Sequence, residues 1–486
     1  MPASMEVRAT TESPLQTGAD TVCVGLIEGE GVTHDVADGV LEALVESGEA
    51  RTAPRKVAVG HAEGVRWLLV GLGPRDELDA EGARVAAAVA ETRARELGAR
   101  TLCWELPHHL GDAFAGGLVE GTLLSAYRFD RFKSDPGEDD RGPGSLVVSA
   151  HHDVVAPAEA AAVIATAQNA ARDLQNTPAN ELTPTRLGER ARELADEVDG
   201  LSAEVDGRKA IAERDMGAFT AVARGSDEEP VLITLRYEPA DSRGPVLGLV
   251  GKAVTFDTGG ISIKPSAKMA EMKFDMSGGA AVLEAVGAIA RLALPVHVVA
   301  VIGATENMPS GHAVKPGDIV RARNGTTIEV NNTDAEGRLV LSDCLAWAVE
   351  QGAERIVDLA TLTGAIIVAL GSTHAGLFAN DDAWAAEVEA AARGSGELVW
   401  RLPLHPEYAE MIKGRYADIV NATEARKAGS ITAAEFLKRF VGDVPWAHID
   451  IAGTAWDLER PYARKGGAGF GVRLLVDLAR RVAAGD

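Results

Sequence analysis

The stretch VLGLVGKAVTFDTGG, residues 246–260, decides the fold expected for this chain. Up to Asp257 it is almost continuously apolar, a pattern typical of a strand buried on both faces of a parallel sheet. Gly259 and Gly260 follow, and glycines let the backbone approach a ligand closely because they carry no side chain. Ligands of open α/β sheets bind beyond the carboxyl ends of the strands. We therefore expect reactive groups around Asp257.

Similar apolar runs recur on both sides of this strand and alternate with alanine-rich stretches. This alternation is typical of sheets covered by helices. In the later part of the chain we expect strands at Val231–Tyr237, Val246–Asp257, Val296–Ala304, Arg355–Ala360 and Trp446–Ile451, and helices at Gly278–Leu292 and Leu341–Gln351. In the first third we expect strands at Thr21–Ile27, Arg66–Val70, Thr101–Trp104 and Ser145–Ala150, and a helix at Ala80–Leu97.

The chain has 486 residues, more than a single hydrophobic core usually supports. An alanine-rich helix signal around Pro157–Asn176 indicates a transition, and we place the domain boundary near residue 165. The expected fold class is α/β. A smaller N-terminal α/β domain of macro-like character would occupy residues 1–165, and a larger C-terminal α/β/α domain with a central, mostly parallel mixed sheet would occupy residues 166–486.

Composition narrows the possible partners and the location. The formal net charge is −24, which argues against non-specific nucleic-acid binding without excluding a local basic patch. The cysteines Cys23, Cys103 and Cys344 form no C-x-x-C pair and indicate no disulfide framework. The N-terminal residues are polar, and no apolar run reaches the length of a membrane span. We expect a soluble, cytoplasmic protein without a membrane partner.

Three acidic segments are candidates for chemistry. Asp257 ends the central strand, and Asp275 directly precedes a helix start, where a capping role is the alternative. In Asn332–Leu339 an extended backbone would put Asp334, Glu336 and Arg338 on one face. Clustered carboxylates without histidines suit Mg²⁺, Mn²⁺, or Zn²⁺ in an oxygen-rich setting. Solvated surface acids and turn residues are the alternatives, because spacing alone does not show that the segments converge.

The chain resembles the leucyl aminopeptidase family. The resemblance is carried by Val250–Pro265, Glu306–Pro309, Asn332–Leu339 and Ala360–Ala365, in the order and spacing of the family's signature segments. It extends to Asn176–Pro178 and His448–Gly453 and covers roughly residues 165–480, whereas the first third matches only in general character. One departure is Thr258, where many relatives carry serine. Threonine keeps the hydroxyl, so we expect no change in the chemistry.

This resemblance implies the following metal ligands: Lys252, Asp257, Asp275, Asp334 and Glu336. Asp257 and Glu336 would bridge two divalent ions per subunit, Mn²⁺ or Zn²⁺. Lys252 and Asp275 would belong to the tighter site, and Asp334 to the more exchangeable one. Only a neutral lysine amine can bind a metal, and burial beside two dications would lower its pKa.

The resemblance also implies a catalytic pair. Lys264 would stabilise the oxyanion, and Arg338 would hold bicarbonate as the general base. The wall of the pocket for the first side chain would comprise Met272, Thr361, Gly364 and Ala452. The implied substrates are peptides with a free N-terminus and a leucine-like first residue, and the implied assembly is a homohexamer.

Two rival functions belong to other classes. The turn Phe256–Gly259 is similar to the D-T-G turn of aspartic proteases, but those enzymes need two such turns and this chain has one. A non-enzymatic protein that binds DNA or another ligand through its N-terminal domain is the second rival. The presence of both Lys264 and Arg338 argues against lost catalysis without excluding an added binding function.

Overall fold

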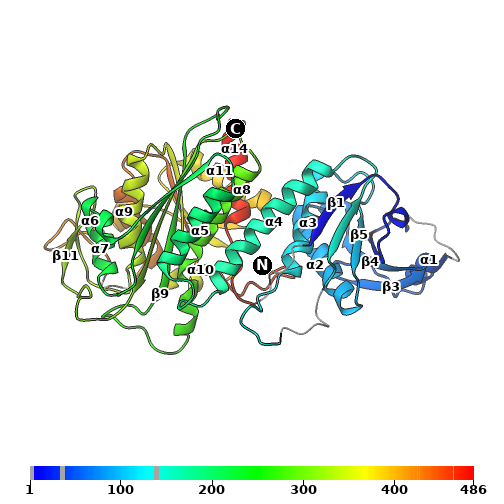
Figure 1. Ribbon diagram of the computed structural model, residues 1–486, viewed down its shortest axis with the longest axis horizontal. Coiled ribbons are helices and arrows are strands. Elements are labelled where there is room, and N and C mark those ends of the chain that lie inside the picture. Colours follow the sequence, from blue (N-terminus) through cyan, green and yellow to red (C-terminus); the bar gives the residue numbers. More distant parts are fainter. Residues whose placement is uncertain are drawn as a thin grey trace. The chain divides into compact units, whose positions relative to one another are not determined.

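The computed structural model describes residues 5–32, 39–135, 142–423, 425, 427–463 and 465–485. The chain divides into two compact units, each with its own sheet (Figure 1). The first unit comprises Met1–Asn169 together with Glu459–Arg464, and the second comprises Ala170–Leu458 and Lys465–Asp486. The sequence pattern gave no sign that a short segment near the C-terminus belongs to the first unit.

The first unit contains a six-stranded sheet in the order β1-β6-β5-β2-β4-β3, in which only β3 runs antiparallel to its neighbour. Its strands are β1 Glu6–Thr10, β2 Thr21–Ile27, β3 Val57–Ala62, β4 Val65–Gly73, β5 Thr101–Glu105 and β6 Ser145–Ser149. Its helices are α1 Val40–Glu46, α2 Ala80–Glu96 and α3 Asp112–Ala126, and α4, Val155–Asn176, continues into the second unit. The expected strands and helix of this part are confirmed, while β1, β3, α1 and α3 were not predicted.

The second unit is built around an eight-stranded mixed sheet in the order β15-β14-β17-β13-β9-β10-β8-β7. The strands are β7 Leu201–Asp206, β8 Val231–Tyr237, β9 Leu247–Asp257, β10 Val298–Asn307, β13 Arg355–Ala360, β14 Ala375–Ala379, β15 Val399–Arg401 and β17 Trp446–Asp450. The central strands β17, β13, β9 and β10 are parallel, so their carboxyl ends lie at one edge of the sheet. The predicted fold class is confirmed. A small second sheet contains β11 Ile319–Arg321, β12 Thr327–Glu329 and β16 Ile419–Val420.

Helices cover both faces of the large sheet (Figure 1). Helices α5, α8, α11 and α14 pack with one another on one face, and α7, α9 and α13 pack on the other. The helices of this unit are α5 Pro184–Glu197, α6 Arg208–Glu213, α7 Gly217–Ala223, α8 Ser277–Arg291, α9 Gly337–Glu350, α10 Gly364–Leu370, α11 Asp382–Ser395, α12 Pro406–Met411, α13 Gly429–Leu437 and α14 Val472–Ala484. Among the residues that the structure describes, no helix is both long and apolar enough to cross a membrane.

Glycines bring α8 unusually close to the central strands. A Cβ atom added to Gly278 would lie 2.0 Å from the carbonyl oxygen of Leu359, and one added to Gly279 would lie 2.7 Å from the Cβ of Ala253. Helix and sheet therefore pack backbone against backbone at this point. The close packing places Asp275, at the end of the 3-10 helix η5 (Met269–Met276), beside Lys252 on β9.

Candidate metal centre

Asp257 is fixed at the carboxyl end of β9 by its neighbour on β10. The register pairs Asp257 with Asn307, whose side-chain amide donates to Asp257 Oδ1 at 2.8 Å. The backbone N–H of Gly259 donates to the same oxygen at 2.8 Å. The second oxygen, Oδ2, lies 2.8 Å from Lys264 Nζ. The sequence had not indicated this holding role for Asn307, although the residue lies within a quoted family segment.

The loop after Asp257 is closed by hydroxyl groups. Thr258 Oγ1 donates to the carbonyl oxygen of Asn307 at 2.8 Å, so the hydroxyl expected at this position makes a bond. Thr333 Oγ1 donates to the carbonyl oxygen of Gly259 at 2.7 Å and accepts from the N–H of Ser262 at 2.8 Å. These bonds tie the loop after β9 to the segment that carries Asp334.

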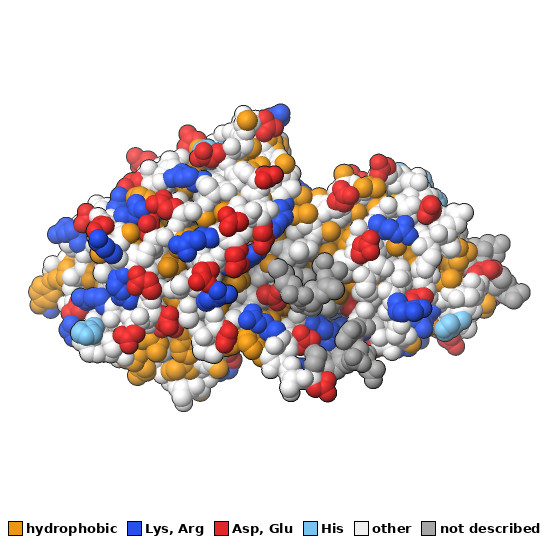
Figure 2. Space-filling view, in the orientation of Figure 1, with side chains coloured by type: hydrophobic (Ala, Val, Ile, Leu, Met, Phe, Trp, Pro, Cys, Tyr) orange, Lys and Arg blue, Asp and Glu red, His pale blue; other side chains and the backbone are white. Residues whose placement is uncertain are grey.

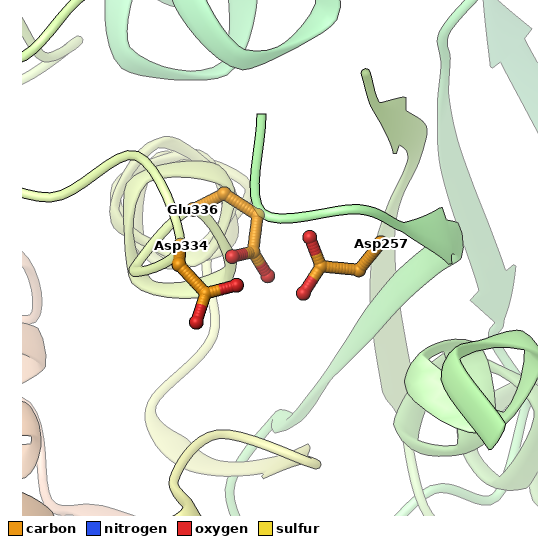
Figure 3. Close-up of side chains that lie close together, drawn as sticks. All are labelled: Asp257, Asp334 and Glu336. Atoms are coloured by element: carbon orange, nitrogen blue, oxygen red, sulfur yellow. The ribbon is translucent and has the colours of Figure 1, made fainter. Parts of the chain in front are cut away.

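The expected extended backbone from Asp334 to Arg338 is wrong. Glu336 has helical angles (φ −75°, ψ −38°), and α9 begins at Gly337, so Arg338 lies in the first helical turn. The alternation rule for strands does not apply there, and helix N-termini favour nearby carboxylates through their free N–H groups. Even so, Asp257, Asp334 and Glu336 converge: one oxygen atom of each lies within 4.8 Å of the others (Figure 3).

Asp275 and Lys252 extend this cluster into the protein. Lys252 Nζ lies 2.8 Å from Asp275 Oδ1 and 2.9 Å from Glu336 Oε1, and it donates to the carbonyl oxygen of Thr361 at 3.0 Å. Thr361 Oγ1 donates to Asp275 Oδ1 at 2.7 Å. The capping alternative for Asp275 is wrong, because Met276 occupies the N-cap of α8 and Asp275 points its carboxylate at Lys252.

The charges of this cluster shift its pKa values. Burial raises the pKa of Asp257, Asp275 and Asp334, and neighbouring carboxylates raise it further. Burial alone would lower the pKa of Lys252 and of Lys264, but the surrounding carboxylates outweigh it and raise both values. The two ammonium groups therefore offset part of the negative charge that the carboxylates bring together.

The cluster fits divalent metal ions. Asp275 Oδ2 and Glu336 Oε2 are buried and have no hydrogen-bond partner among the described residues. A buried carboxylate oxygen without a partner is costly, and a cation would remove that cost. Four carboxylates and one amine form a hard donor set of the kind that Mn²⁺ accepts and that Zn²⁺ tolerates.

Arg338 is a buried cation beside this cluster. Its Nη1 donates to the carbonyl oxygen of Asn421 at 2.6 Å, and its Nε has no hydrogen-bond partner in the described part of the chain. Burial lowers the pKa of Arg338 to about 10, although the negative charges of Glu336 and Asp450 act to raise it. The guanidinium therefore stays charged at neutral pH.

The expected pocket residues lie at the same edge of the sheet. Thr361 directly follows β13, and Ala452 follows the neighbouring strand β17. Gly364 is the first residue of α10 and is exposed, and a Cβ atom added to it would meet nothing within 4 Å. Met272 is half-buried on η5, ahead of Asp275. The assignment of these residues to one pocket stays a prediction.

The buried carboxylates and lysines at the carboxyl edge of the mixed sheet form a site that suits divalent metal ions. Family models narrow the class of protein. The model described as the cytosol aminopeptidase family, catalytic domain, matches residues 169–476, and that family's N-terminal domain matches residues 25–136. The chain belongs to the cytosol aminopeptidase family and is a metal-dependent aminopeptidase that acts on peptides. The D-T-G-like turn around Asp257 therefore belongs to a cytosol aminopeptidase and not to an aspartic protease.

Individual relatives agree with this assignment. A probable cytosol aminopeptidase of Roseiflexus castenholzii is 47% identical and covers 98% of this chain and 99% of its own length. A second probable cytosol aminopeptidase, of Solibacter usitatus, is also 47% identical and covers 96% of this chain and 97% of its own length. Among solved structures, a mutant tomato leucine aminopeptidase superposes with a TM-score of 0.89 at 33% identity, covering 99% and 97%. The bottromycin maturation enzyme BotP in complex with Mn superposes with a TM-score of 0.87 at 37% sequence identity. The match covers 96% of this chain and 100% of BotP.

Proposed function

We propose that this aminopeptidase uses two divalent ions per subunit and prefers peptides with a leucine-like first residue and a free N-terminus. The observation that carries the proposal is the convergence of Asp257, Asp334 and Glu336 beside Lys252 and Asp275 (Figure 3). Two oxygen atoms of this cluster are buried without a partner among the described residues, and a bound cation would satisfy them.

The burial of the ligands supports the proposed division of labour. The side chains of Lys252 and Asp275 are 3% and 9% exposed, as suits a tighter site, while Asp334 is 32% exposed, as suits an exchangeable one. Glu336 contacts Lys252, and Asp257 contacts Lys264; by the family resemblance these two carboxylates would bridge the ions. Lys252 would give up a proton to serve as a ligand, because only the neutral amine has a free lone pair.

Ions held in this way would acidify a water molecule, polarise the scissile carbonyl and bind the α-amine of the substrate. Either Mn²⁺ or Zn²⁺ suits the donor set, and the Mn complex of BotP supports manganese. An acylated or internal amide lacks the free amine, so it would lose both its position and its rate.

The chain's own cations would complete the reaction. Lys264 is 21% exposed, within reach of both solvent and Asp257, and would stabilise negative charge on the carbonyl oxygen. Arg338 would hold bicarbonate as the general base, because its buried guanidinium forms no ion pair with any described residue. Thr361, Gly364, Ala452 and Met272 would shape the pocket for the first side chain, with discrimination of only about 1–3 kcal/mol per methylene.

Assembly and location complete the proposal. We propose a homohexamer, supported by the family resemblance and by exposed apolar side chains on the second unit, among them Val368 at 89% and Trp400 at 62% exposure. A cytoplasmic location is supported by the name of the curated relatives. We propose no nucleic-acid partner, because the net charge is −24 and Figure 2 shows basic and acidic groups interspersed on the visible face.

Hydrolysis of leucine p-nitroanilide before and after metal depletion tests this function. We expect chelation to abolish the activity and Mn²⁺, Co²⁺ or Zn²⁺ to restore it. Binding of DNA by a protein without peptidase activity would instead support the non-enzymatic alternative. Matched activity with leucine and glycine anilides would contradict the proposed apolar pocket while leaving the metal requirement intact.

A further inference from the structure

Asp450 is a fully buried carboxylate at the end of β17 that the proposed metal centre does not use. Its Oδ1 accepts the backbone N–H groups of Leu362 at 3.1 Å, Thr363 at 3.4 Å and Ala452 at 3.3 Å. The first two follow β13, and the third follows β17. One oxygen atom therefore holds together the two backbone segments that carry Thr361, Gly364 and Ala452, three members of the proposed pocket.

The other oxygen of Asp450 fixes the start of α10. Thr363 Oγ1 donates to Asp450 Oδ2 at 2.6 Å, which uses the only proton of this hydroxyl. The lone pairs of Thr363 Oγ1 then accept from the N–H of Ile366 at 3.3 Å and from Ser430 Oγ at 2.7 Å. All hydrogen-bonding positions of this hydroxyl group are therefore occupied. It links Asp450 to the first turn of α10 and to Ser430 on α13.

The same segment is anchored independently on the side of the metal centre. Thr361 donates to Asp275 through its side chain, and its carbonyl oxygen accepts from Lys252. Residues 361–363 are thus held at one end by proposed metal ligands and at the other by Asp450. Gly364, the next residue, has open space where a side chain would be. Asp450 accepts from the backbone N–H groups of both Thr363, which precedes Gly364, and Ala452.

We propose that Asp450, acting through Thr363, is a positioning residue that sets the width of the pocket for the substrate's first side chain. This inference rests on the proposed function and deepens it. Without the side-chain bond between Thr363 and Asp450, only the backbone bonds to Asp450 Oδ1 hold residues 362 and 363. The start of α10 then loses its link to Asp450, and the pocket fits a leucine side chain less closely. The proposed metal ligands keep all their own contacts, so metal binding is retained.

The chain offers a matched control for a merely structural role. Asp358 on β13 is also fully buried; it accepts from Trp446 Nε1 at 2.7 Å, and its Oδ1 lies 2.6 Å from His448 Nδ1. These two partners lie on β17, as Asp450 does, but neither belongs to the 361–364 segment. Asp358→Asn removes a charge of the same kind from the same pair of strands without touching the pocket.

The experiment compares Thr363→Val, Thr363→Ser, Asp450→Asn and Asp358→Asn in the full-length, Mn²⁺-loaded protein. Bound Mn²⁺ per chain, kcat and KM are measured with leucine and alanine p-nitroanilides. In Thr363→Val and Asp450→Asn we expect unchanged Mn²⁺, a raised KM for the leucine substrate, and a roughly fivefold or larger fall in the leucine-to-alanine ratio of kcat/KM. Thr363→Ser keeps the hydroxyl and should keep the parental ratio, and Asp358→Asn should keep it too.

The other outcomes either overturn this proposal or refute the proposed function. A parental ratio in folded, metal-loaded Thr363→Val overturns the proposal, even if Asp450→Asn fails to fold. An equal fall of the ratio in Asp358→Asn also overturns it, because the effect would then come from general loosening of β13 and β17. A parent protein that shows no preference for leucine refutes the proposed function instead, so the two failures are distinguishable.

Discussion

Glu336 and Arg338 are two positions apart in the sequence but have different partners in the fold. Glu336, at the N-cap of α9, turns its carboxylate toward Lys252 and the other acids. Arg338, in the first turn, reaches the carbonyl oxygen of Asn421. The helix start separates the two side chains, so in the proposed mechanism Glu336 would bind the metal ions and Arg338 would bind an anion.

Substitution of Glu336 should therefore remove metal and activity together. A neutral amide bridges two dications poorly, so Glu336→Gln should bind fewer ions per chain and lose its peptidase activity. Elemental analysis of the purified variant, alongside a leucine p-nitroanilide assay, measures both quantities. A Glu336→Gln protein with its full metal content and parental rate would exclude Glu336 as a ligand.

Substitution of Arg338 should leave the metal in place. An arginine side chain is a cation and not a ligand, so Arg338→Ala should retain its ions while kcat falls by about 10²–10⁴-fold through loss of the anchored base. Added bicarbonate should recover part of this rate and should do little for Glu336→Gln. If Arg338→Ala loses its metal, or turns over at the parental rate, the proposed role of Arg338 is wrong.

A side chain at position 364 should narrow the proposed pocket. Gly364 faces open space and has no positive φ, so Gly364→Val should fold normally. We expect its KM for leucine p-nitroanilide to rise about tenfold or more, whereas alanine p-nitroanilide should be affected less. Equal kinetics of variant and parent with both substrates would place Gly364 outside the pocket.

Much of the site was predictable at the scale of single residues, but not the residues that hold it together. Spacing and family resemblance identified the carboxylates and lysines, and the structure brings Asp257, Asp334 and Glu336 together. Asn307, Asn421 and Asp450 were given no role, because their importance lies in hydrogen bonds across strands far apart in the sequence. Local sequence patterns carry no signal for such contacts.

At the scale of elements, the buried central strands were predictable and the edge strands β1 and β3 were not. The apolar runs at β8, β9, β10, β13 and β17 correspond to the expected strands to within a few residues. β1 is a short strand with no buried residue, and β3 has only two buried positions, so neither shows a long apolar run. The start of α9 was expected at Leu341 but lies at Gly337, because the segment up to Leu339 was interpreted as extended.

The close packing of α8 on the sheet makes a prediction at this scale. Gly278→Ala would put a Cβ atom 2.0 Å from the backbone carbonyl oxygen of Leu359. This oxygen is part of the backbone and not the end of a flexible side chain, so the clash cannot be relieved by a side-chain rotation. We expect a loss of about 1–3 kcal/mol in the free energy of unfolding, together with weaker metal binding as Asp275 is displaced. Urea denaturation measures the first effect. Gly364→Ala is the control, because its Cβ meets nothing within 4 Å, and comparable stability of both variants would contradict the packing argument.

At the scale of the whole molecule, the division into two units was expected, but their composition was not fully predictable. One compact unit comprises Met1–Asn169 with Glu459–Arg464, and the other comprises Ala170–Leu458 with Lys465–Asp486. The assignment of residues 1–165 and 166–486 to separate domains remains a proposal. The segment 459–464 joins the first unit through contacts such as the bond from Tyr462 Oη to Glu81 at 2.7 Å. Such a contact spans most of the chain and leaves no mark in local periodicity.

The proposed requirement for a free amine concerns the intact catalytic unit. An acetamide is a poor metal ligand, so N-acetyl-leucyl peptides should not be cleaved under conditions in which the free peptides are. Chromatographic analysis of the products from both peptides checks this. Cleavage of the acetylated peptide at a comparable rate would mean that the substrate is not held by its amine.

The most direct test of the central claim is the metal content of the purified chain measured together with its activity. The convergence of Lys252, Asp257, Asp275, Asp334 and Glu336 predicts two bound divalent ions per chain. Leucine p-nitroanilide hydrolysis should fall to background when both ions are removed and return as Mn²⁺ is added back. Full activity of protein that is demonstrably free of metal would contradict the account.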